Sequence, residues 1–311
     1  GITTVGEFHY LHHHSATRDY AFDSTVLEAA REAGIRLVLL NAFYRMGGFG
    51  QQLKSEQQRF RSDSVSEFLG NMDSLRAHVT GNQQLGVVAH SVRAVPVADI
   101  IELHRGARDR DLPFHLHIEE QRREIEECIH ATGKTPMRLL LDAIEDATAV
   151  TAVHATHTDA DDLGEFLRRG GAVCVCPLTE GNLGDGIPGA HITAAELVCL
   201  GTDSNERIDM FEEMRWLEYG QRLRGEMRGA FRDDTGEVAP RLLRAATVVG
   251  AASLSVSAGS IAVGKSADFC AVKLNHPTLR GIEPRGLASA LVFGCDASVV
   301  DSTWVGGKRV F

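Results

Sequence analysis

Histidine and aspartate side chains recur at the ends of short apolar runs, which is a pattern typical of metal sites. His90, His117 and His154 each close one such run, and Asp203 follows another in the segment Gly-Thr-Asp-Ser. Imidazole and carboxylate together suit Zn²⁺, which at catalytic sites keeps one coordination position open for water. A single histidine at a strand end is more often hydrogen-bonded or solvated. The repeated placement at separate runs therefore predicts a metal-dependent site.

Glu120 lies three residues beyond His117, in the segment His-Ile-Glu-Glu. A carboxylate at this position can take a proton from a water molecule and pass it on, as general acid and base catalysis requires. A second interpretation remains open, because Glu119 and Glu120 can also be acids in the first turn of the next helix. The helix dipole favours negative charge there.

Arg93 is the residue that points to the charge of the substrate. It follows His90 by three residues, and its planar guanidinium can bind a carboxylate with two parallel hydrogen bonds. Of the His-rich run 9–14, only His9 and Tyr10 are near enough to a strand end to face the same pocket. We therefore expect a small anionic substrate, although an ion pair between Arg93 and a neighbouring glutamate remains open.

Seven apolar runs alternate with helical patterns and would position these side chains. The runs are 3–8, 36–40, 84–89, 113–117, 149–154, 172–176 and 197–202. Strands that alternate with helices predict right-handed βαβ units and a parallel sheet, and continuous apolar runs fit strands buried on both faces. No GxGxxG motif follows a run, so a doubly wound sheet is disfavoured. We predict a (β/α)₈ TIM-type barrel with its site at the carboxyl ends of the strands, one βα unit short.

The flanking elements lead to three further expectations. Asp23 or Ser24 is expected to cap a helix that ends at Gly34. From Ser255 onward, turn residues around short strands predict a β-rich appendage, in which 287–293 is one strand and 305–308 is a hairpin turn. We therefore expect a barrel domain over 1–254 and part of a β-sandwich over 255–311.

Composition narrows the class of protein. The 311 residues carry 32 Lys and Arg against 42 Asp and Glu, a net charge of −10, which argues against nucleic acid and anionic membrane surfaces as partners. No run reaches the roughly 18 apolar residues needed to span a bilayer. The six cysteines form no CxxC pair, which indicates reduced thiols and a cytoplasmic protein. A homodimer is the ordinary expectation for such a barrel.

Four segments resemble the amidohydrolase superfamily and, within it, the formimidoylglutamate deiminases of histidine degradation. They are EFHYLHH at 7–13, HIEEQ at 117–121, CPLTEGNLGDG at 176–186 and GTDSN at 201–205. The resemblance extends through nearly the whole chain. It implies zinc-dependent hydrolysis of N-formimino-L-glutamate to N-formyl-L-glutamate and ammonia, with one zinc ion as cofactor.

The resemblance also implies a role for each residue that matches the family pattern. His117 and Asp203 would be metal ligands, and Glu120 would be the proton-shuttling carboxylate. Asp203 would also be catalytic, because it would accept a proton from the water together with Glu120. His154 would assist the attack on the substrate. The remaining matches, His90, Arg93 and Tyr10, would contact the substrate and its carboxylates.

The chain departs from the family pattern at one place. The pattern includes an HxH pair on the first strand as two further metal ligands, and no such pair matches in these 311 residues. His115-Leu116-His117 belongs to a later strand. We therefore expect that an N-terminal part precedes Gly1. Two alternatives stay open: a zinc deaminase of a purine-type base, which the aromatic content of 6% disfavours, and a truncated, catalytically inactive protein.

Overall fold

The computed structural model describes residues 1–15 and 19–311, which form two compact units. The first unit is Thr4–Gly171, and the second combines Gly1–Thr3 with Ala172–Phe311. Each unit is described by itself. Among the described residues, no helix is both long enough and apolar enough to cross a membrane.

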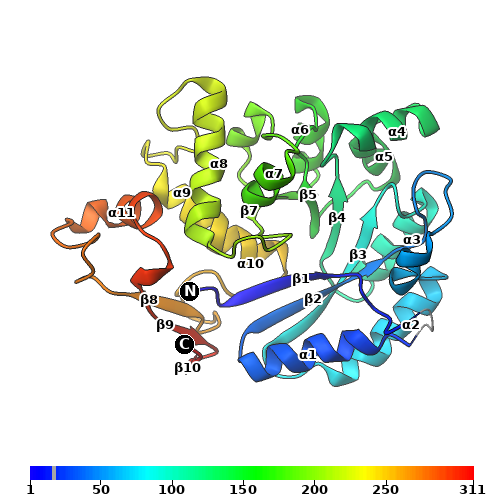
Figure 1. Cartoon of the computed structure of the whole chain (residues 1–311), viewed down its shortest axis with the longest axis horizontal. Coiled ribbons are helices and arrows are strands. Elements are labelled where there is room, and N and C mark those ends of the chain that lie inside the picture. The colour runs from blue at the N-terminus through cyan, green and yellow to red at the C-terminus, as the bar shows by residue number, and fades with distance from the viewer. Residues whose placement is uncertain (16–18) are drawn as a thin grey trace. The chain divides into compact units, whose positions relative to one another are not determined.

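The first unit is a parallel sheet whose strands are joined by helices (Figure 1). Its strands are β1 (Thr4–His9), β2 (Arg36–Phe43), β3 (Gln83–Ser91), β4 (Phe114–Ile118) and β5 (Val150–His154). Its helices are α1 (Ala21–Ala33), η1 (Ser55–Phe60), α2 (Val65–Leu75), η2 (Arg76–His78), α3 (Val97–Arg108), α4 (Arg122–Thr132), α5 (Pro136–Ala143) and α6 (Ala160–Arg168). Each strand pairs in parallel with the next along the chain, as βαβ units require.

Burial on both faces explains why the central parts of these strands are mainly apolar. All eight residues of β2 are buried, because β1 and β3 flank it and helices α1 and α2 cover it. The register aligns the carboxyl ends of the strands. His9 is opposite Asn41, Ser91 is opposite His117, and Ile118 is opposite His154. The histidines at these ends are therefore brought to one edge of the sheet.

The second unit contains two further parallel strands and a small antiparallel sheet. The parallel pair is β6 (Ala172–Val175) and β7 (Val198–Leu200), and the antiparallel sheet is β8 (Phe269–Val272), β9 (Val300–Val305) and β10 (Lys308–Arg309). Its helices are α7 (Pro177–Leu183), η3 (Ala190–Ala194), α8 (Met210–Gly225), α9 (Ala239–Arg244), η4 (Ala245–Val249), α10 (Gly250–Ser253), η5 (Pro284–Gly286), α11 (Leu287–Gly294) and η6 (Ala297–Val299). All seven predicted strands are thus present, and the hairpin turn at 305–308 is confirmed.

One predicted strand is a helix. Residues 287–293 lie in α11, where Leu287, Ala290 and Leu291 pack against a small core of Leu279, Cys295 and Val299. The contacts at positions 287, 290 and 291 follow helical spacing. A short run that is apolar throughout carries no periodicity to separate a buried strand from a buried helix, and the sequence prediction failed for that reason.

Two predicted helix starts are also wrong. Helix α1 begins at Ala21 after Tyr20, so neither Asp23 nor Ser24 caps it, and Asp23 lies buried inside the helix. Helix α4 begins at Arg122, so Glu119 and Glu120 belong to the turn after β4 rather than to the first helical turn. Elsewhere the caps follow the sequence, as at Asp159, whose side chain accepts from the amides of Asp161 and Asp162.

Candidate functional site

Three histidine rings meet at the carboxyl ends of β3, β4 and β5. The ring of His117 stacks on that of His154 with centroids 5.4 Å apart and an interplanar angle of 20°. The rings of His90 and His117 meet edge-on, with centroids 5.0 Å apart. Phe8 of β1 stacks on the other side of His117, with centroids 4.0 Å apart. The first unit therefore brings together the three histidines predicted from the strand ends.

The electrostatic setting keeps His117 neutral. Burial lowers the pKa of its imidazole well below the usual value, and the neighbouring His90, His154 and Arg93 lower it further. A neutral imidazole has a free lone pair near pH 7, which is the form that binds a metal ion. The donor chemistry at this position thus fits a divalent cation such as Zn²⁺.

The backbone beside these histidines is strained. Glu119, His154 and Ala155 have φ values of 52°, 73° and 50°, in the left-handed region that side chains other than glycine rarely adopt. Hydrogen bonds across the two strand ends hold this conformation, from the amide of Ala155 to the carbonyl of Ile118 at 3.0 Å and from that of His157 to the carbonyl of Glu119 at 3.2 Å. Such strain concentrates at functional sites.

Glu119 and Glu120 point to different neighbours and have different roles. Glu120 Oε1 lies 3.7 Å from Nε2 of His154, and its side chain is partly exposed. Glu119 is buried, and its Oε1 accepts from the amide of Met137 at 2.8 Å in the first turn of α5. Glu120 therefore lies beside the histidine rings, while Glu119 connects the strand end to α5.

Tyr10 and Arg93 border the same group of rings. The ring of Tyr10 lies 5.4 Å from that of His90 and 5.0 Å from that of Phe60 in η1. Arg93 has no ion pair or hydrogen bond with another residue in the described part of the chain, although its charge acts on His90, Tyr44 and the buried Glu124. Its predicted ion pair with a neighbouring glutamate is thus absent among the described residues. The guanidinium stays available for an anion.

Sequence reasoning missed Tyr44 and Phe60. Tyr44 is buried directly after β2, with its ring 4.6 Å from that of His90 and 5.6 Å from that of Phe60. The predicted strand ended at Leu40, whereas β2 continues to Phe43, so Tyr44 lay outside every predicted strand end. The continuation of the run by Ala42, Phe43 and Tyr44 was the signal that could have found it. Phe60 lies in the short helix η1, which no sequence pattern predicted.

A second His/Asp group lies between β1 and α1. His9, His12 and Asp23 each offer one ligand atom, and these atoms lie within 4.8 Å of one another. Both rings already hydrogen-bond Asp23 Oδ1, at 3.1 and 2.8 Å, while Asn41 donates to Oδ2 at 2.9 Å. Burial raises the pKa of Asp23, but the bonds from the two histidines outweigh it and hold the pKa below its usual range. Hydrogen bonds thus account for this cluster without a metal ion.

Asp203 belongs to the second unit. It follows β7, is exposed and has a φ of 38°, another left-handed value. The hydroxyl of Thr202 donates to Oδ1 of Asn205 at 2.6 Å, and the hydroxyls of Thr179 and Ser204 lie 2.9 Å apart. These bonds hold the turn that carries Asp203. The roles of Asp203 and of the other predicted site residues stay predictions.

The chain belongs to the amidohydrolase family, whose pattern it matches over residues 1–310. By this membership it is a hydrolase of C–N bonds, and its fold is a partial TIM-type barrel with a small antiparallel sheet, as predicted. It is 36% identical over 318 residues to formimidoylglutamate deiminase of Pseudomonas aeruginosa, covering 100% of this chain and 70% of that protein. It is 29% identical to 5-methylthioadenosine/S-adenosylhomocysteine deaminase of Thermococcus onnurineus, covering 93% and 65%.

Solved structures agree with the fold. A crystal structure of an amidohydrolase from Brucella melitensis has a TM-score of 0.89 and 31% identity, covering 99% of this chain and 69% of that one. An adenosine deaminase from Xanthomonas campestris with bound zinc has a TM-score of 0.78 at 23% identity, covering 99% and 65%, and shows the fold alone. The chain thus spans 65 to 70% of the length of these four relatives.

Proposed function

We propose that the full-length protein is a zinc-dependent deiminase that hydrolyses N-formimino-L-glutamate to N-formyl-L-glutamate and ammonia. The observation that carries the proposal is Arg93, a cation without an ion-pair partner among the described residues, in the electrostatic surroundings of His90 and His117. An unpaired guanidinium beside metal-binding chemistry suits a substrate that is anionic at one end and hydrolysable at the other. The 36% identity to formimidoylglutamate deiminase supports the same substrate.

The proposed roles follow from the chemistry of each side chain. We propose His117 and Asp203 as metal ligands. Zinc, when bound, lowers the pKa of a water molecule from 15.7 towards about 7 and so supplies hydroxide near neutral pH. Glu120 would accept a proton from the attacking water as the water oxygen adds to the formimino carbon, and His154 would donate a hydrogen bond to the tetrahedral centre that results. Glu120 then delivers the proton to the departing nitrogen, which leaves as ammonia.

We propose that Arg93, Tyr10 and His90 determine substrate specificity. Arg93 and Tyr10 bind a carboxylate of the glutamate portion, and His90 borders it. Because binding through Arg93 is made to a part of the substrate that does not react, its loss weakens binding in the ground state and the transition state alike.

A second candidate is a deaminase of a purine-type nucleoside. The rings of Phe8, Tyr10, Tyr44 and Phe60 gather near His90 and His117 and could stack on a base. The low overall aromatic content therefore does not argue against this substrate, because the few aromatic residues are concentrated at the site. The relatives at 28 and 29% identity act, by name, on such nucleosides.

Ammonia release separates the two candidates. Full-length protein is incubated with N-formimino-L-glutamate or with 5′-methylthioadenosine, and ammonia is measured. We expect turnover of the first substrate, and for Arg93→Ala a KM at least about tenfold higher with a similar kcat. Arg45→Ala is the matched control, since Arg45 is paired with Asp99 at the same end of the sheet. Turnover of 5′-methylthioadenosine alone would instead establish the nucleoside deaminase.

A further inference from the structure

The hydrogen bonds around Tyr44 fix which way its hydroxyl acts. Gln57 Oε1 accepts from the amide of Lys54 at 2.9 Å, so the other end of this side chain is its NH₂ group. That group donates to Tyr44 Oη, also at 2.9 Å. The hydroxyl oxygen of Tyr44 is therefore an acceptor towards Gln57, and its own proton must point elsewhere. No described residue accepts it.

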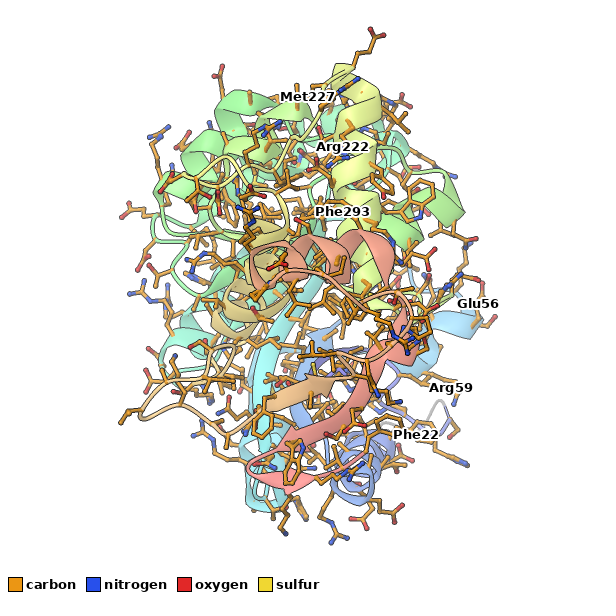
Figure 2. The ribbon with its side chains drawn as sticks, turned by 90° about the vertical axis from the view of Figure 1, so that its left-hand side faces the viewer. Phe22, Glu56, Arg59, Arg222, Met227 and Phe293 are labelled. Atoms are coloured by element: carbon orange, nitrogen blue, oxygen red, sulfur yellow. The ribbon has the colours of Figure 1, made fainter. Side chains whose placement is uncertain are left out.

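Gln57 is held in place by its own helix. On η1, Arg59 exchanges two hydrogen bonds with the backbone of His13, each at 3.2 Å. Its guanidinium also lies 5.6 Å from the centre of the Phe22 ring, and Figure 2 shows these two side chains together. Because η1 is fastened to two other segments, Gln57 can fix the orientation of the Tyr44 hydroxyl rather than follow it.

The second hydrogen-bond donor near His90 is the guanidinium of Arg93, which can only donate hydrogen bonds. Its positive charge lowers the pKa of Tyr44, against the larger effect of burial, which raises it. His90 contacts Tyr44, with ring centroids 4.6 Å apart. Besides burial, the positive charge of Arg93 lowers the pKa of His90. Tyr44, whose ring contacts His90, and Arg93, which follows His90 by three residues, are thus two donors near one histidine, and neither has an acceptor among the described residues.

Two hydrogen-bond donors near one histidine, one of them positively charged, can bind an anion. We propose that Tyr44, oriented by Gln57, is a specificity-determining residue that donates a hydrogen bond to the same substrate carboxylate that Arg93 binds. This inference rests on the proposed function and deepens it, because it limits the substrate class to compounds that carry a carboxylate besides the group that is hydrolysed. A neutral nucleoside would leave both donors and the charge of Arg93 without a partner, which a half-buried site tolerates poorly.

The inference is tested by binding rather than by turnover. Glutarate, a dicarboxylate without a hydrolysable group, is titrated into full-length protein by calorimetry. For Tyr44→Phe we expect binding about tenfold weaker, since only the donor is lost and the ring stays. Gln57→Leu is expected to weaken binding by a few-fold, because the hydroxyl loses its fixed direction. Tyr219→Phe, at an exposed tyrosine of α8, is the matched control and should bind as the wild type does.

The outcomes separate this inference from the proposed function. If Tyr44→Phe binds glutarate within twofold of the wild type while thermal unfolding shows a folded protein, the inference is overturned. Weaker glutarate binding in a protein that releases no ammonia from N-formimino-L-glutamate supports the anion site and rejects the proposed function. Ammonia release with an unchanged KM in Tyr44→Phe rejects the inference and leaves the proposed function in place.

Discussion

At the scale of single residues, the candidate site residues that lie at strand ends could be predicted from the sequence. His90, His117 and His154 were found because a parallel sheet delivers the ends of its strands to one edge, whatever the loops do. Asp23 was misjudged for the opposite reason. It looked like a local helix cap, but its carboxylate is used by His9 and His12, which precede it by more than ten residues. Tertiary partners of this kind leave no local pattern.

Glu124 shows how burial can dominate the titration of a carboxyl group. It is 5% exposed, its Oε1 has no partner among the described residues, and burial raises its pKa to about 7. Arg93 opposes this rise, and the charges of Glu119 and Glu120 add to it. The carboxyl is therefore protonated in the folded chain over a pH range in which an unfolded chain has lost the proton.

This shift makes stability depend on pH. The raised pKa stabilises the folded state below about 4.5, and the benefit is lost as the pH rises to about 7. We expect Glu124→Gln, which stays neutral, to gain on the wild type over this range by roughly 3 kcal/mol of unfolding free energy. Urea unfolding at pH 5 and pH 8 measures the gain. Glu126→Gln, on the exposed side of α4, is the control, and equal pH profiles for Glu124→Gln and wild type would refute the prediction.

At the scale of elements, strands were predicted more accurately than helix boundaries. The bounds of β1 and β4 are each within one residue of prediction, because an apolar run flanked by polar residues marks both ends. Helix starts depend on which side chain caps the first turn, and in α5 that turn has two acceptors. Thr135 accepts from the amide of Arg138, and Glu119 from that of Met137. The second acceptor comes from 18 residues earlier in the chain, beyond any local motif.

The connection between β4 and α5 can be tested through Glu119. Replacing it with alanine leaves the buried amide of Met137 without an acceptor, and we expect a loss of roughly 1–3 kcal/mol of unfolding free energy. Glu119→Gln keeps an acceptor oxygen and is expected to lose less than about 1 kcal/mol. Denaturant unfolding of both variants decides the point. Equal stability of the two would mean that the bond to α5 does not stabilise the fold.

At the scale of the whole molecule, the repeated βα pattern made the barrel predictable, while the appendage was only partly so. The repeat gives seven independent signals for one architecture, whereas each element of the appendage must be judged alone. That is why 287–293 was mistaken for a strand. The expected domain division at 254, the homodimer, the absence of nucleic-acid and membrane partners and the cytoplasmic location stay predictions.

The central claim is that His117 and Asp203 hold one catalytic metal ion, and metal content tests it most directly. Full-length wild type, His117→Ala and Asp203→Ala are purified and their metal is measured by mass spectrometry, with ammonia release from N-formimino-L-glutamate followed in parallel. We predict one zinc ion per wild-type chain, and loss of both metal and ammonia release in each variant. A wild-type chain without metal, or variants that keep their zinc and their activity, would contradict the account.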